Sequence, residues 1–149
     1  MNFFEKCAAI KNEVDARLKK YFSAKILATN SKSEKRLLKD LREFVLRGGK
    51  RLRAVLLIAS YGLLGGKIKK AILDFACGLE LGHAALLIHD DIIDNDRMRR
   101  GQKTLHCYYQ DLIKKPGSKK HLLGEKSALI AGDFLSHLGL ELILDSDFP

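Results

Sequence analysis

The 149-residue sequence contains few of the residues that interrupt helices or cross-link a chain. Only two prolines are present, Pro116 and Pro149. The three cysteines are Cys7, Cys77 and Cys107, which are widely spaced and form no Cys-x-x-Cys pair. An odd number of isolated cysteines argues against a disulfide framework and against a zinc site. We therefore expect three reduced thiols.

Long apolar segments are also missing. No apolar run approaches the roughly 18 residues that crossing a bilayer requires. Charged residues interrupt the N-terminal segment, where a signal peptide would be apolar. These residues are Glu5, Lys6, Lys11 and Glu13. We therefore expect a cytoplasmic protein without a transmembrane segment.

Strand-like alternation is equally scarce, whereas apolar residues recur at spacings of three and four over long stretches. This pattern is typical of α-helices, and 46% hydrophobic residues are enough for one core. We predict an all-α fold in one domain. The expected helices cover 3–28, a segment capped by Ser31 or Ser33 that runs to about Arg47, 50–64, 67–94, a short segment after an irregular stretch at 95–105, and 122–144. A solvated loop is expected at 114–120.

Apolar side chains surround the last predicted helix instead of forming a single stripe. They are Leu129, Ile130, Phe134, Leu135, Leu138, Leu140, Leu142, Ile143 and Leu144. A helix that is apolar on all sides has to be covered on all sides. Either it is the central helix of this domain's own bundle, or another polypeptide covers it.

The helix predicted over 67–94 carries a stripe that begins apolar and ends in carboxylates. Spacings of 4, 3, 4 and 4 place its members on one face: Leu79, His83, Leu86, Asp90 and Asp94. We expect this face to enter the core, with Asp91 beside its acidic end. Carboxylates at a helix C-terminus oppose the macrodipole and call for a cation. Mg²⁺ fits, since it binds one or two carboxylates together with phosphate oxygens; alternatively, the aspartates are solvated or cap a turn.

Two basic segments frame these carboxylates in a chain whose net charge is +9. Such a charge calls for an anionic partner: nucleic acid, a membrane surface or a phosphorylated small molecule. Residues 48–53 (GGKRLR) open the helix predicted over 50–64, where Lys50 and Arg53 would share a face beside free backbone amides that favour an anion. Arg99 and Arg100 follow the carboxylates and suit phosphate oxygens. The order of these elements predicts a site for two phosphorylated groups with an apolar pocket behind it.

These motifs resemble those of the trans-prenyl diphosphate synthase family. GGKRLR at 48–53 is similar to its GGKRxRP motif, and residues 80–106 (ELGHAALLIHDDIIDNDRMRRGQKTLH) resemble the helix and loop of its first aspartate-rich motif, DDxxD. ALIAGDFL at 128–135 resembles the helix that follows. Ala54 and Lys103 stand where the family usually has proline. The resemblance covers nearly all of the chain and implies the N-terminal half of the isoprenoid synthase helical bundle.

The resemblance also implies an activity, the condensation of isopentenyl diphosphate with an allylic diphosphate (dimethylallyl, geranyl or farnesyl). The catalytic residues would be Asp90, Asp91 and Asp94, of which Asp90 and Asp94 bind Mg²⁺ on the allylic diphosphate. The residues that bind diphosphate would be Lys50, Arg53, His83 and Arg100 for the isopentenyl group and Arg99 for the allylic group. No aromatic side chain stands at Ala85 or Leu86, positions at which bulky residues limit product length in the family. The implied product exceeds fifteen carbons, and twenty are expected.

The second half of the family's domain, with another aspartate-rich motif and a lysine, has no counterpart in the sequence. Residues 1–149 are thus expected to be one partial polyprenyl synthase domain. A split enzyme completed by a second chain in a hetero-oligomer would account for this, and so would a truncated product or a non-catalytic regulatory subunit. A basic helical module that binds nucleic acid would explain the charge. It would not favour three carboxylates beside its arginines, and no helix-turn-helix spacing is present.

Overall fold

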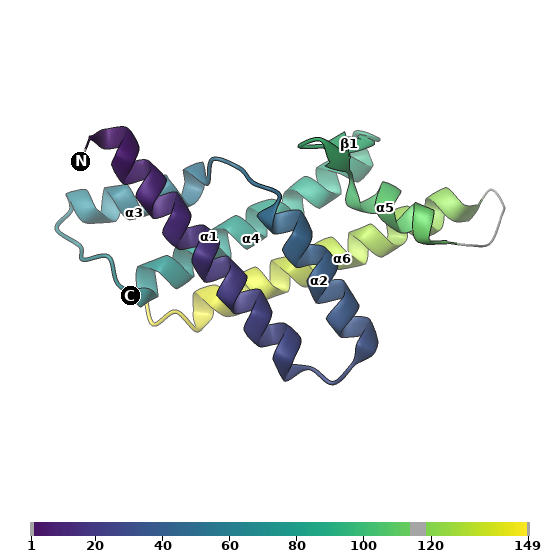
Figure 1. The fold of residues 1–149 in the computed structure, drawn as a ribbon, viewed down its shortest axis with the longest axis horizontal. Coiled ribbons are helices and arrows are strands. Elements are labelled where there is room, and N and C mark those ends of the chain that lie inside the picture. The colour runs from purple at the N-terminus through teal and green to yellow at the C-terminus, as the bar shows by residue number, and fades with distance from the viewer. Residues whose placement is uncertain (1, 114–118, 149) are drawn as a thin grey trace.

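A computed structural model describes residues 2–113 and 119–148. The described chain is helical apart from one short hairpin (Figure 1). Its elements are α1 (Phe3–Ala28), α2 (Lys32–Leu46), α3 (Leu52–Leu63), α4 (Lys70–Ile93), β1 (Met98–Arg99), β2 (Gln102–Lys103), α5 (Leu105–Leu112) and α6 (Lys119–Leu144). The predicted all-α class is confirmed. The predicted loop at 114–120 lies mostly outside the described residues, and its last two residues belong to α6.

Helices α4 and α6 lie side by side along the length of the molecule, and α1 and α2 cross over them (Figure 1). The α4 and α6 backbones touch at two glycines. A Cβ atom on Gly78 would lie 2.6 Å from the Gly139 carbonyl oxygen, and one on Gly139 would lie 2.8 Å from that of Gly78. Because neither position has room for a side chain, these glycines set the spacing between α4 and α6.

The core fills the space between this pair and the first three helices. Its largest fully buried side chains come from every long helix. Among them are Leu18, Phe22, Leu41, Ile58, Leu81, Ile88 and Leu135. Burial of this kind contributes about 25 cal/mol per Å² of apolar surface, so packing between helices, more than the propensity of any one of them, holds the bundle together.

Local signals explain most helix ends. The Ser31 hydroxyl accepts a hydrogen bond from the Glu34 amide and caps α2, while Ser33, the other expected cap, lies inside the helix. Helix α3 begins two residues later than predicted, because Arg51 has a left-handed backbone with φ of 50° and ends the preceding loop. Lys50 is therefore outside the helix, and the argument that it shares a helical face with Arg53 is wrong.

The stretch expected to be irregular contains a two-stranded antiparallel hairpin, β1–β2. Arg100 and Gly101 form its turn with φ of 52° and 75°. Positive φ at both central residues is the signature of a type I′ turn, which matches the twist of paired strands. The hairpin carries Arg99 in β1 and presents Arg100 at its tip.

Two expectations about apolar surface need correction. By length and composition, α4 and α6 could each cross a membrane, although 56% and 39% of their most apolar windows are buried within the bundle; core helices of soluble bundles have the same character. Within the described chain α6 is not covered on all sides, which corrects the alternative of a central helix in this domain's own bundle; coverage by another polypeptide stays a prediction. Six of its large apolar side chains are exposed: Leu122, Leu123, Leu129, Ile130, Leu140 and Leu144.

Candidate functional site

A recess of about 110 Å³ lies at the start of α3. Its lining includes five basic residues from three separate segments: Lys50, Arg51, Arg53, His83 and Arg100. All of these except Arg51 were expected from the sequence to hold one diphosphate, so the structure brings that whole set together. We call this recess the cradle.

The loop before α3 gives the cradle its shape. The Arg100 guanidinium donates a hydrogen bond to the Gly48 carbonyl oxygen, which ties the hairpin tip to the loop. Gly49 has φ of 138°, and a Cβ there would lie 2.9 Å from an Arg100 terminal nitrogen. Only glycine satisfies both the backbone conformation and the close approach of the guanidinium. The two basic segments of the sequence therefore meet through these glycines.

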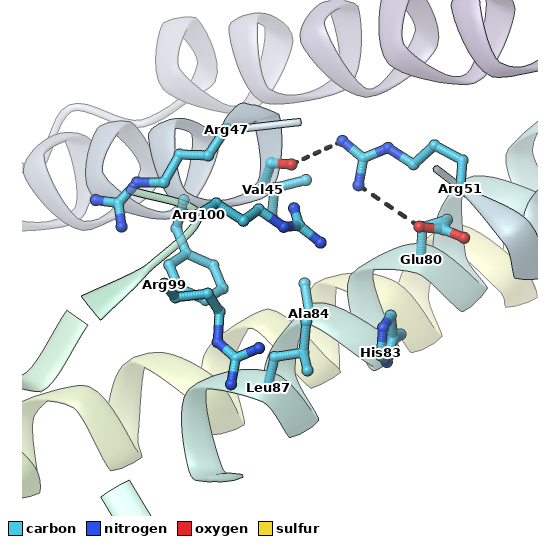
Figure 2. A pocket seen from close by; sticks show the side chains of 10 residues that line it. Val45, Arg47, Arg51, Glu80, His83, Ala84, Leu87, Arg99 and Arg100 are labelled. Carbon is cyan, nitrogen blue, oxygen red and sulfur yellow. Dashed lines mark hydrogen bonds and ion pairs between the residues drawn. The ribbon is translucent and has the colours of Figure 1, made fainter. Parts of the chain in front are cut away.

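A smaller cavity lies behind the cradle, and Figure 2 shows the side chains around it. Arg47, Arg99 and Arg100 reach it from α2 and from the hairpin, while His83 and Leu87 line it from α4. With Arg51, four guanidinium groups line this cavity beside the Glu80 carboxylate, and the like charges repel one another. A bound anion would relieve this repulsion.

Burial and neighbouring charge shift the pKa values of two cradle residues. Desolvation lowers the pKa of His83, and the Arg53 charge lowers it further. Desolvation also lowers the pKa of Arg100, followed by the charges of Arg51 and Arg99. Both shifts mark a site where positive charge is held at a cost, and binding of a diphosphate would offset that cost.

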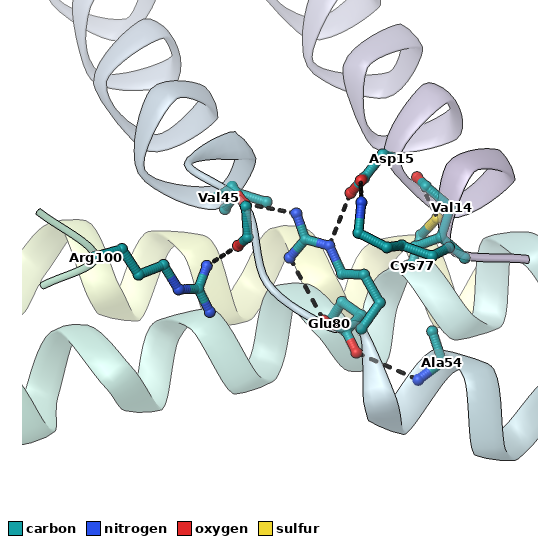
Figure 3. A network of polar contacts seen from close by, with 10 residues as sticks. Val14, Asp15, Val45, Ala54, Cys77, Glu80 and Arg100 are labelled. Atoms are coloured by element: carbon teal, nitrogen blue, oxygen red, sulfur yellow. Dashed lines mark hydrogen bonds and ion pairs between the residues drawn. The ribbon is translucent and has the colours of Figure 1, made fainter. Parts of the chain in front are cut away.

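Arg51 organises the wall of the cradle, a role that was not predicted from the sequence. Its side chain is nearly completely buried and donates hydrogen bonds to Asp15 Oδ1 at 2.8 Å, to the Val45 carbonyl oxygen at 2.7 Å and to Glu80 Oε2 at 3.5 Å (Figure 3). The spacing of Glu80 and His83 at i and i+3 on α4 was the available sign that Glu80 reaches the same recess.

The aspartates at the end of α4 divide into one buried and two exposed residues. Asp91 is fully buried, and the Arg99 Nε donates to its Oδ1 at 2.5 Å. Burial raises the pKa of Asp91, and Arg99 opposes the shift. The other Asp91 oxygen has no hydrogen-bond partner among the described residues. Asp90 and Asp94 are exposed.

This division corrects the expected orientation of the stripe on α4. Leu86 is 61% exposed, and the stripe faces outward at Leu86, Asp90 and Asp94. The buried face of the same segment carries Ile88 and Asp91 instead. The reason is packing: α1, α3, α5 and α6 cover the rest of α4, and no described element covers the stripe at Leu86, Asp90 and Asp94.

The exposed aspartates fit the expected magnesium ion. Asp90 and Asp94 are one turn apart on α4, so both carboxylates can face one ion. No cluster of three or more metal-binding side chains is found in residues 2–113 and 119–148. Two protein carboxylates are nevertheless a usual set for Mg²⁺, which completes its octahedron with water and phosphate oxygens. Arg99, expected at the allylic diphosphate, points to Asp91 and also lies 3.8 Å from Asp96.

An apolar groove of about 430 Å³ runs between α4 and α6. Arg53 and His83 line both this groove and the cradle, so the two are contiguous. Leu86, one of the two positions that the sequence links to product length, lines the groove. Ala85 does not, because it is 2% exposed and packs in the core. Leu140 and Ile143 form part of the opposite wall on α6.

Comparison with known proteins identifies the family. The polyprenyl synthetase family model matches residues 34–148, and the chain belongs to this family. The geranylgeranyl pyrophosphate synthase of Geoglobus acetivorans is 38% identical over 113 residues, which cover 76% of this chain and 31% of the relative. The chloroplastic geranylgeranyl pyrophosphate synthase of Capsicum annuum is 32% identical over 152 residues, or 95% of this chain and 37% of the relative.

The fold agrees with this membership. A crystal structure of geranylgeranyl pyrophosphate synthase from Corynebacterium glutamicum, complexed with isoprenyl diphosphate and magnesium, is similar with a TM-score of 0.79 and 28% identity. The similarity covers 100% of this chain and 43% of that one. The resemblance in the sequence and the isoprenoid synthase fold are both confirmed. The chain spans about a third of the length of the two curated relatives.

Proposed function

We propose that this chain is part of a trans-prenyltransferase, the part that holds isopentenyl diphosphate and the magnesium-bound end of an allylic diphosphate. One observation carries the proposal: five basic residues from three segments converge on one recess that is contiguous with an apolar groove. An amphiphile with a diphosphate head and a prenyl chain matches both. The basic charge then has a small-molecule partner, and nucleic acid is not needed to account for it.

The proposed reaction breaks the allylic carbon–oxygen bond and forms a carbon–carbon bond with the isopentenyl double bond, after which a proton is lost. Lys50, Arg53, His83 and Arg100 bind and orient the isopentenyl diphosphate. Asp90 and Asp94 hold Mg²⁺, which when bound neutralises the charge that develops on the departing diphosphate. The groove holds the prenyl chain and keeps water from the allylic cation.

We further propose that additional polypeptide closes the site. The groove is open, and Leu86 and Leu140 are 61% and 54% exposed on its walls. Exposed apolar surface of this kind marks an interaction site. In the split-enzyme form of the proposal, a second cytoplasmic chain supplies the C-terminal half with the second aspartate-rich motif. The alternative is a regulatory subunit that keeps the fold without catalysing the reaction.

The test is a reconstitution assay with isopentenyl diphosphate, an allylic diphosphate and Mg²⁺. We expect little turnover from the 149-residue chain and restored turnover when a polypeptide carrying the second aspartate-rich motif is added. Robust turnover by the pure chain would contradict the need for a partner. In the reconstituted enzyme, Asp90→Asn should abolish turnover. Full activity of that variant would favour the regulatory subunit.

A further inference from the structure

We propose that Glu80 sets the affinity of the cradle by holding a fixed negative charge inside it. This inference rests on the proposed role of the cradle in binding diphosphate. Glu80 lines the recess together with Lys50, Arg53 and Arg100, although an acid there opposes the binding of an anion. Its carboxylate is 4% exposed, so solvent screens little of its charge.

The position of Glu80 is fixed from two sides. Its Oε1 accepts a hydrogen bond from the Ala54 amide at 3.2 Å, and its Oε2 lies 3.5 Å from Arg51 (Figure 3). Ala54 is the third residue of α3, whose N-cap residue, Arg51, makes no side-chain capping bond. Glu80 therefore caps α3 from α4 and occupies part of the positive helix end that would otherwise attract the ligand.

Arg51 shares its charge between two carboxylates, and only one of them faces the cradle. Asp15, on α1, accepts from Arg51 at 2.8 Å and also pairs with Lys11 at 2.7 Å. It does not line the recess, whereas Glu80 does. The charge of Glu80 also acts against the lowered pKa values of His83 and Arg100. Its field thus reaches the residues that would bind the ligand.

A cradle with its five basic groups and no acid would hold diphosphate tightly and release it slowly. An acid at a fixed distance lowers that affinity without removing a ligand-binding group. Glu80 is accordingly a positioning residue with an electrostatic effect: it places the start of α3 and reduces the positive potential of the recess.

The direction in which one substitution changes pyrophosphate affinity separates this electrostatic effect from a purely structural one. Glu80→Gln keeps the shape of the side chain and an oxygen for the Ala54 amide, but removes the charge. We expect the 149-residue chain to bind inorganic pyrophosphate about fivefold more tightly after this change, with a stronger dependence on salt. Titration calorimetry at two salt concentrations measures both. Unchanged or weaker binding by a folded variant would overturn the inference.

Asp15→Asn is the matched control, because it removes one negative charge from the other partner of Arg51, outside the recess. We expect it to change pyrophosphate affinity by less than about twofold, since its charge is more distant and more exposed. An effect as large as that of Glu80→Gln would overturn the local role of Glu80. In the reconstituted enzyme, Glu80→Gln should lower KM for isopentenyl diphosphate without raising kcat, whereas a structural defect would raise KM.

Folding is checked by circular dichroism. If Glu80→Gln loses helical signal, the double variant Arg51→Gln with Glu80→Gln takes its place. It removes one positive and one negative charge, so the net charge of the recess stays the same. Its pyrophosphate affinity should stay within about twofold of the unmodified chain, and a larger change would overturn the inference. If the unmodified chain does not bind pyrophosphate and Lys50→Gln has no effect, the cradle itself is wrongly assigned and the proposed function fails with it.

Discussion

The two ends of the proposed site are built differently. At the cradle, each basic group comes from a segment fixed by other contacts, such as the Arg100 bond to Gly48 and the pairing of Arg51 with Glu80. At the acidic end of α4, Asp90 and Asp94 are exposed, and the groove beside them is open. The residues expected at the first region converge within this chain, whereas the groove at the second is open between its walls on α4 and α6.

The difference follows from what each ligand would need. A diphosphate is recognised by fixed positive charge, which loops and helix ends of one chain can supply. A metal-bound diphosphate and a reactive allylic cation need ligands from several sides and the exclusion of water. Under the proposed function, the open end would therefore depend on further polypeptide, and the cradle would not. The predictions below test that separation.

The largest effect is expected at the open end. Asp90→Ala or Asp94→Ala in the reconstituted enzyme should lower turnover by more than about 100-fold, because each removes a proposed metal ligand. Stability should hold or rise by up to about 1 kcal/mol, since a carboxylate at a helix C-terminus opposes the macrodipole. Turnover assays and thermal melts measure the two effects separately.

Asp111→Asn serves as the control for these variants. Asp111 is an exposed aspartate on α5 that pairs with Lys103 at 2.6 Å, away from the stripe. It should leave turnover within about twofold, as expected for an exposed ion pair. Parallel loss of stability and activity in the Asp90 or Asp94 variants would mean that these aspartates are structural.

At the cradle, we expect a change of geometry to weaken substrate binding. Gly49→Ala places a Cβ 2.9 Å from an Arg100 terminal nitrogen at a φ of 138°, so the Arg100 guanidinium must shift from its place in the cradle. Loss of one charge-assisted contact to the ligand is expected to raise KM for isopentenyl diphosphate about tenfold, with a smaller effect on kcat. Gly48→Ala is the control: it has similar backbone strain, with φ of 104°, but nothing within 4 Å of the new Cβ. Equal KM effects would show that strain, and not Arg100, matters.

Substitutions in the groove and in the core beneath it should affect product length and stability differently. Leu86→Phe adds a ring in the open groove and should shift products to shorter chains while leaving stability nearly unchanged, because Leu86 is exposed. Ala85→Phe instead overpacks the core and should cost about 1–3 kcal/mol. Mass spectrometry of products and thermal melts distinguish the two. Shorter products from a stable Ala85→Phe variant would restore the expectation drawn from the sequence.

The helices could be predicted from the sequence because apolar periodicity and caps act locally. The bounds of α1 agree with the prediction, and Ser31 caps α2 as one of the expected alternatives. The error at α3 arises at Arg51, where a non-glycine residue takes a left-handed backbone that no composition rule signals. The hairpin was missed because two-residue strands are too short to show alternation.

The site was predicted in part for a similar reason. Periodicity groups residues on one face of a helix, and the stripe from Leu79 to Asp94 is indeed continuous. Periodicity does not show, however, which face of the helix the rest of the chain covers. Burial of Asp91 in place of its neighbours depends on the hairpin that brings Arg99 to it. The pairing of Arg51 with Asp15 and Glu80 likewise depends on how α1, α2 and α4 meet.

The smallest expected effect concerns pH and stability near the open end. His106 on α5 is 3% exposed, its Nδ1 has no partner among the described residues, and burial lowers its pKa despite the nearby charge of Glu125. The unfolded chain takes up a proton near the usual pKa of about 6.5, whereas folded His106 resists it. The unfolding free energy should therefore fall as pH drops below about 6.5.

Thermal melts between pH 7.5 and pH 5 test this prediction, with each kcal/mol lost lowering Tm by about 2–4 °C. His106→Gln should show a smaller fall in Tm than the unmodified chain. The comparison isolates His106, because His83, whose pKa is also lowered, is common to both proteins. His137→Gln, which changes an exposed histidine on α6, should keep the full pH dependence. If His137→Gln flattens the dependence of Tm on pH as much as His106→Gln does, the acid sensitivity does not come from the buried His106 imidazole. The unpaired Nδ1 of His106 then has no measurable effect on stability.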